Sequence, residues 1–93
     1  MTMDMKTKIP VKSGKTASRI IDGEAVIVLL DKQETIVLND VGSRIWEIMD
    51  GKKDIDEISG AIMSEFDAAR EEALKDITEF VEDMVQRGAA EIK

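Results

Sequence analysis

The chain has 93 residues, with 20 Asp and Glu against 13 Lys and Arg, a formal net charge of −7, and no Cys, His or Tyr. These absences exclude disulfides, thiolate nucleophiles, zinc-thiolate sites and any catalysis that needs an imidazole base. A chain of this length predicts one small domain. Its longest apolar run, residues 25–30, is far too short to span a bilayer, and its first residues lack the apolar stretch of a signal peptide, so we expect a cytoplasmic protein without membrane contact.

The charge is spread unevenly along the chain. Residues 1–19 hold five basic side chains and one acidic side chain, a net charge of +4, so that the remainder carries −11. Nucleic-acid binding depends on Lys and Arg that neutralise phosphates, which the acidic body disfavours. Residues 1–16 also lack periodicity and contain the only proline. We therefore expect a flexible basic N-terminal arm over residues 1–16, followed by a folded domain over residues 17–93.

A three-stranded antiparallel meander is predicted at the start of that domain. Runs rich in β-branched residues at 17–21 and 24–30 flank Asp22-Gly23, a pair typical of a type I′ hairpin turn because both central residues need φ > 0. A polar tetrad at residues 31–34 then leads into a third run that ends at residue 38. Because the second run is almost wholly apolar, helices must pack on the sheet.

Three helices are predicted after the sheet. Apolar residues recur at helical spacing over 41–50, over 55–66 and between residue 67 and residue 88. The expected N-terminal caps are Asn39 or Asp40 for the first helix, a capping box of Asp54 and Glu57 for the second and Asp67 for the third, and the expected C-terminal stops are Gly51 and Gly88. The order of three strands and three helices predicts an α+β fold.

Neither a catalytic site nor a metal site is predicted. The tightest carboxylate group, Asp54, Asp56 and Glu57, lies at a helix start, where nothing would drive two pKa values apart as a catalytic pair requires. The sequence has no calcium-loop spacing and neither of the glycine-rich phosphate motifs. We therefore expect no enzymatic activity, no cofactor and no metal.

The third strand, residues 34–38, would leave one row of backbone groups unpaired at a sheet edge. The commonest use of such an edge is to recruit an extended peptide as an added strand, and pairing with a second copy in a homodimer is a competing use. The third helix beside that edge would offer apolar pockets, and its acidic side chains would hold basic residues. A plain domain without such a site is the alternative.

Residues 37–51, VLNDVGSRIWEIMDG, with IDGEAV at 21–26, resemble the PqqD-like proteins, the peptide chaperones of pyrroloquinoline quinone (PQQ) synthesis. Segments of the second and third helices, residues 55–58 and 76–88, fit the same family. The likeness extends over roughly residues 17–89. Departures are the small residues Ala89 and Ala90 where the family often has a large aliphatic, and the arm, which matches nothing; they leave the subfamily open.

The resemblance implies a RiPP recognition element with a winged-helix-like fold, a three-stranded antiparallel sheet followed by three helices. Such a domain is a non-catalytic peptide chaperone. It binds the leader of a ribosomally synthesised precursor peptide by strand addition and presents it to a modifying enzyme, a radical SAM enzyme in PQQ and related pathways or a leader peptidase in lasso peptide pathways. By position, the implied peptide-binding residues are Glu34, Thr35, Ile36, Val37, Leu38, Arg70, Leu74, Ile77, Thr78 and Val81.

Two other readings remain open from the sequence. A winged-helix DNA-binding or regulatory domain would share the topology, but its recognition helix would bring six acidic side chains toward phosphate. A structural scaffold module would need no ligand at all. We therefore expect a peptide ligand and no nucleic acid.

Overall fold

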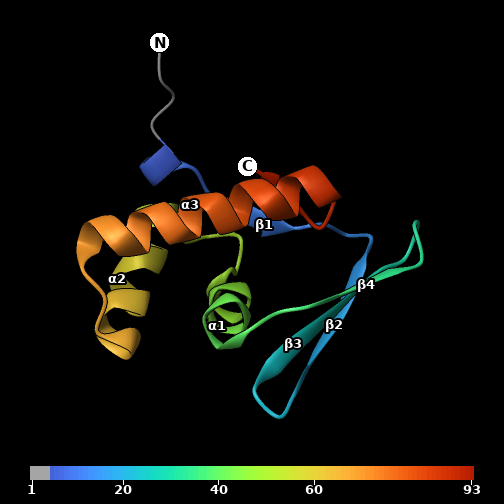
Figure 1. Cartoon of the computed structure of the whole chain (residues 1–93). Coiled ribbons are helices and arrows are strands. Elements are labelled where there is room, and N and C mark those ends of the chain that lie inside the picture. The colour runs from blue at the N-terminus through green and yellow to red at the C-terminus, as the bar shows by residue number, and fades with distance from the viewer. Residues whose placement is uncertain (1–4) are drawn as a thin grey trace.

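The structure, a computed structural model, describes residues 5–93 and confirms the α+β fold. Its elements are, in chain order, the 3-10 turn η1 (Met5–Thr7), strands β1 (Pro10–Lys12), β2 (Thr16–Ile21), β3 (Glu24–Leu29) and β4 (Glu34–Val37), helices α1 (Asp40–Ile48), α2 (Ile55–Phe66) and α3 (Arg70–Arg87), and strand β5 (Ala90–Ile92). Figure 1 shows α3 lying across α2 and α1, with the β2-β3-β4 sheet beside α1. None of the described helices is long and apolar enough to cross a membrane.

The predicted meander is confirmed as an antiparallel sheet in the order β2-β3-β4. Asp22 and Gly23 have φ values of 52° and 82°, as a type I′ turn requires. Although β3 is apolar at nearly every position, only Ala25, Ile27 and Leu29 are fully buried, because the helices cover one face of the sheet. The register places Ile36 of β4 on that same face.

Helices α1 and α2 begin where the sequence predicts. The Asn39 side chain accepts a hydrogen bond of 2.8 Å from the Gly42 N–H, which satisfies one orphan donor of α1. Asp54 and Glu57 form the expected capping box at the start of α2. Helix α1 ends at Ile48, two residues earlier than expected.

The expected cap of the third helix is wrong. Ala69 is the N-cap of α3 and makes no side-chain hydrogen bond, whereas Asp67 ends α2 in the left-handed conformation, with φ 53°. Aspartate tolerates that conformation better than most residues, so the same residue type that caps a helix start also suits a tight helix end. Gly88, with φ 84°, ends α3 as predicted.

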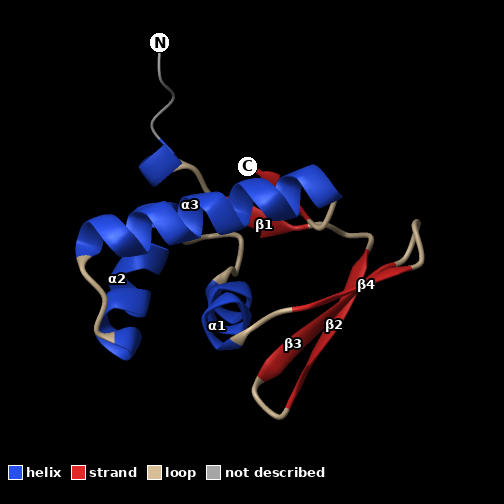
Figure 2. Ribbon diagram, viewed as in Figure 1, coloured by secondary structure: helices blue, strands red, loops and turns tan. Residues whose placement is uncertain are grey.

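Strand β1 was not predicted, and it lies within the segment that was expected to be a flexible N-terminal arm. Residues 10–12 pair antiparallel with β5, so that the two chain ends form a second small sheet beside α3 (Figure 2). Pro10 is fully buried, and the Lys8 carbonyl accepts from the Ile55 N–H at 3.0 Å. The flexible arm expected over 1–16 is thus structured from residue 5 onward, because its partner strand, about 80 residues away in the sequence, supplies the hydrogen bonds. The start of that expected arm, residues 1–4, lies outside the described residues.

Candidate functional site: the β4 edge and a cleft between α1 and α3

Strand β4 is an open sheet edge, because among residues 5–93 it pairs with β3 alone. The Leu38 N–H donates to the Ala25 carbonyl at 2.9 Å, which makes residue 38 a hydrogen-bonded position of the ladder. Such positions alternate along an antiparallel strand. Ile36 therefore faces β3 with its backbone groups, whereas Thr35 and Val37 direct their N–H and C=O groups away from the sheet. The backbone groups of Thr35 and Val37 can therefore pair with another strand.

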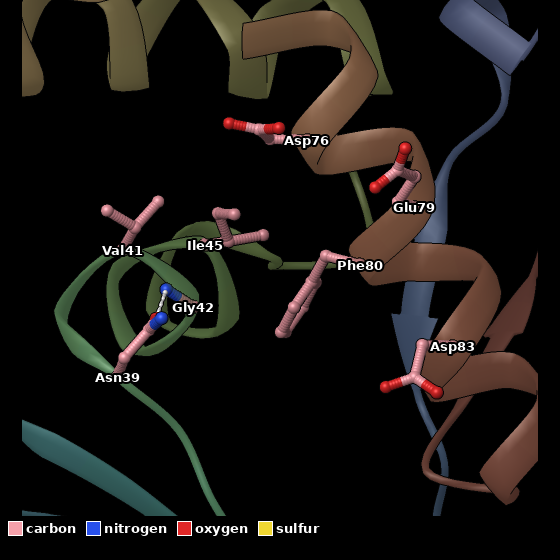
Figure 3. A pocket seen from close by; sticks show the side chains of 8 residues that line it. All are labelled: Asn39, Val41, Gly42, Ile45, Asp76, Glu79, Phe80 and Asp83. Carbon is pink, nitrogen blue, oxygen red and sulfur yellow. Dashed lines mark hydrogen bonds between the residues drawn. The ribbon is translucent and has the colours of Figure 1, made fainter. Parts of the chain in front are cut away.

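A cleft of about 510 Å³ lies between the N-terminal part of α1 and the middle of α3. Figure 3 shows the Phe80 ring pointing from α3 toward α1, with Asp76 and Asp83 on either side of it. The lining residues are Asn39, Val41, Gly42, Ile45, Asp76, Glu79, Phe80 and Asp83. Asn39, which follows β4 by two residues, lines the cleft, so the chain passes directly from the open edge to the cleft. We call the β4 edge and this cleft together the groove.

Two contacts hold the groove in shape. A β-carbon on Gly42 would lie 3.4 Å from Cε1 of Phe80 and 3.2 Å from Oδ1 of Asn39, so the absence of a side chain lets the ring approach the first turn of α1. At the other end, Nζ of Lys32 in the β3–β4 turn donates to the Arg87 carbonyl at 2.9 Å. This bond ties the turn before β4 to the last turn of α3.

The groove wall on α3 is acidic. Asp76 and Glu79 form no ion pair or hydrogen bond with any side chain among residues 5–93, whereas Asp83 accepts from Arg87 Nε at 3.2 Å. Within the same residues, no group of three or more acidic side chains is placed to hold a metal ion. The site therefore combines an open strand edge, an aromatic side chain and unpaired carboxylates.

The predicted β4 residues divide between the edge and the core. Glu34, Thr35 and Val37 are exposed, with 61% of Val37 accessible. Ile36 and Leu38 are only 7% and 8% exposed, so their side chains belong to the core. A bound peptide could therefore contact the backbone of the β4 edge and the exposed side chains of Glu34, Thr35 and Val37. It could not reach the buried side chains of Ile36 and Leu38.

None of the residues predicted on the third helix lines the cleft. Ile77 and Val81 are 0% exposed and pack inside the core. Successive helical residues are about 100° apart around the axis, so if Ile77 faces the core, Leu74 and Thr78 lie on the flank opposite Phe80. Arg70 pairs with Asp56 of α2. Their role in peptide binding stays a prediction, because the apolar stripe of a helix identifies its core side but not the flank on which a peptide would bind.

The groove residues that sequence reasoning missed are Val41 on α1 and Asp76, Glu79, Phe80 and Asp83 on α3. The sequence predicted that acidic side chains of the third helix would hold basic residues, but it singled out neither these acids nor Phe80 as site residues. One signal was present: Phe80 is one of only three aromatic residues, and it lies between two acids at helical spacing, Asp76 and Asp83.

Known proteins with this architecture have been solved with bound peptides. The structure "TbiB1 in Complex with the TbiA(beta) Leader Peptide" matches with a TM-score of 0.82 and 30% identity, over 87% of this chain and 94% of that chain. The structure "Lasso peptide synthetase B1 complexed with the leader peptide" has the same fold, with a TM-score of 0.81 and 19% identity over 89% of this chain and 98% of that chain.

Comparisons of sequence point to the same group of proteins as these structures do. The "PqqA binding protein" of Rhizobium meliloti (strain 1021) is 27% identical over 96 residues, which cover 95% of this chain and 98% of the relative. Residues 24–89 match the family described as "Coenzyme PQQ synthesis protein D (PqqD)". This match spans well over half of the chain and confirms the resemblance in sequence, so the chain belongs to the PqqD family.

Proposed function

We propose that this protein binds the leader of a ribosomally synthesised precursor peptide as an added strand on β4 and presents it to a modifying enzyme. The observation that carries the proposal is the open β4 edge, which the chain leaves at Asn39, a residue that lines the cleft between α1 and α3. Membership of the PqqD family supports it, as does the likeness to a protein solved with a leader peptide.

The geometry gives each part of the groove a role. The N–H and C=O groups of Thr35 and Val37 supply main-chain hydrogen bonds to the leader, which give affinity with little dependence on sequence. Side chains of an added strand alternate between its two faces, so every second leader residue points toward the cleft and its Phe80. Selectivity comes from these positions. A leader that is already ordered on this protein loses less conformational entropy when it binds the enzyme.

The partner enzyme in this proposal is a radical SAM enzyme or a leader peptidase, and the protein itself contributes binding and no catalysis. A chain without Cys or His is suited to such a role. Because its ligand is made by ribosomes, we place the protein in the cytoplasm. Homodimerisation through the β4 edge would occupy the same backbone groups as the leader, so the two events would exclude each other.

Proline substitutions at the two sheet edges test the proposal. Val37→Pro removes an outward N–H of β4 and should weaken binding of the precursor's leader at least tenfold in a calorimetric titration, while the sheet keeps its hydrogen bonds to β3. Ile20→Pro is the matched control, because the register places Ile20 at an outward position on the opposite edge, β2. It should leave leader affinity unchanged.

Three results would contradict the proposal. They are equal losses in both variants, a loss with Ile20→Pro alone, or no leader binding by the unmodified protein. A titration with generic duplex DNA at low salt tests the winged-helix alternative, since binding that falls steeply with added salt would favour it.

A further inference from the structure

We infer that the groove selects leaders in which a Lys or Arg lies two residues from a large apolar residue, with the basic side chain at Asp76 and Glu79 and the apolar one on Phe80. This inference rests on the proposed function and specifies its ligand. It follows from the spacing of the α3 residues and from their charge.

The spacing of the α3 side chains suits an extended peptide. Asp76 and Phe80 are four residues apart, which is about 6 Å along a helix axis. Residues i and i+2 of an extended strand are about 6.6 Å apart and point to the same face. A leader strand that runs beside α3 therefore places two successive cleft-facing side chains opposite Asp76 and Phe80.

The apolar position is defined by Phe80 and the first turn of α1. Figure 3 shows the ring directed toward Gly42 and Ile45, with Val41 at the same side of the cleft. Val41 and Phe80 are only partly buried, although both pack against the core. A large apolar side chain placed here would remove the remaining apolar surface of both residues from water.

The basic position is defined by carboxylates that lack partners. Asp76 and Glu79 are unpaired among residues 5–93, whereas the cations of α1 and of the β3–β4 turn have other partners. Arg44 of α1 is 2.7 Å from Glu65, and Lys32 donates to the Arg87 carbonyl. A leader strand that covers the groove shields the carboxylates from water, so a basic side chain is favoured there and an acidic one is repelled. Asp83 offers a weaker site, because Arg87 already pairs with it.

A random library of 12-residue peptides displayed on phage tests this inference on the full chain, and the selection does not require the sequence of the leader. It should enrich peptides with a Lys or Arg two positions from Leu, Ile, Met, Phe or Trp. Against the double variant Asp76→Asn with Glu79→Gln, the basic preference should disappear while the apolar one remains. The matched control, Glu71→Gln with Glu82→Gln, neutralises two acids on the opposite flank of α3 and should keep both preferences.

Fluorescence anisotropy with one enriched peptide gives the magnitude. The Asp76→Asn, Glu79→Gln variant should bind about tenfold more weakly at low salt, and the difference should shrink as salt screens the pair. Enrichment without a charge preference, or an unchanged preference in that variant, would overturn this inference and leave the proposed function standing. A library that yields no peptide sensitive to Val37→Pro would overturn the proposed function, and this inference with it.

Discussion

The backbone N–H of Ala25 in β3 donates a hydrogen bond of 2.7 Å to the hydroxyl of Ser43 in α1. That hydroxyl in turn donates to the Leu38 carbonyl at 3.2 Å. The Ser43 hydroxyl thus bridges the Ala25 N–H and the Leu38 carbonyl at the point where the chain leaves β4 and enters α1. Both Ala25 and Ser43 are almost wholly buried, so water cannot replace the bridge. One serine therefore fixes the end of the edge strand against the helix that lines the cleft.

Ser43→Ala should lower the free energy of unfolding by about 2 kcal/mol, because it leaves a buried N–H and a buried C=O without partners. Chemical denaturation measures the loss. Ser59→Ala is the control, since the buried Ser59 hydroxyl donates to the Ile55 carbonyl within α2, which also accepts a helical N–H. It should cost less than about 1 kcal/mol. Equal losses would show that the Ser43 bridge contributes nothing special.

Phe80→Ala should weaken leader binding about tenfold or more, because it removes the aromatic side chain of the cleft. Leu74→Ala truncates another partly buried apolar side chain of α3, on the opposite flank, and should leave the affinity unchanged. Both changes lower thermal stability, so affinity is measured by titration at a temperature where circular dichroism shows both variants folded. A larger loss of leader affinity with Leu74→Ala would place the binding site on the flank of α3 that carries Leu74 and Thr78, as the sequence predicted.

Removal of residues 1–13 should lower the free energy of unfolding by about 3 kcal/mol, since it deletes β1 and exposes the core surface that Pro10 covers. The amide protons of Ile55 and Lys93 should then exchange faster, because they donate to the carbonyls of Lys8 and Ile9. Replacement of residues 5–13 by a Gly-Ser linker should have the same effect. Unchanged stability and exchange would support a loose arm.

Asp50→Asn should lower the melting temperature at pH 7 by an amount that shrinks as the pH falls. The Asp50 carboxylate accepts from Lys53 Nζ and from the N–H groups of Lys52 and Lys53, which hold its pKa well below the usual 3.8. A carboxyl group whose pKa is lowered by folding stabilises the protein above its unfolded pKa and loses this effect as the pH falls through its folded pKa.

Melting curves at pH 7, 5 and 3 test this dependence. Asp31→Asn is the control, because within the described part of the chain the Asp31 carboxylate reaches only Lys15, at 3.9 Å. Asp31→Asn should change the melting temperature little at any of the three pH values. A difference between Asp50→Asn and the unmodified protein that stays constant with pH would contradict the role given to Asp50.

Local features were readable from the sequence because local groups make them. The turn at Asp22-Gly23, the Asn39 cap and the capping box of Asp54 and Glu57 each depend on atoms within three residues. The helical stripe of α3 also follows from local helix geometry. These patterns, with the family motif at residues 37–51, sufficed for the α+β fold and for the edge strand.

Distant pairing and helix orientation required the folded chain. Strand β1 exists because residues 10–12 meet β5, and three residues carry no periodicity that would predict it. The stripe of α3 shows which side is buried, but Phe80 and Leu74 lie on its two flanks. Only the position of α3 relative to α1 decides that Phe80 lines the cleft. Residue spacing along one helix contains no information on its neighbours, so that choice belongs to tertiary structure alone.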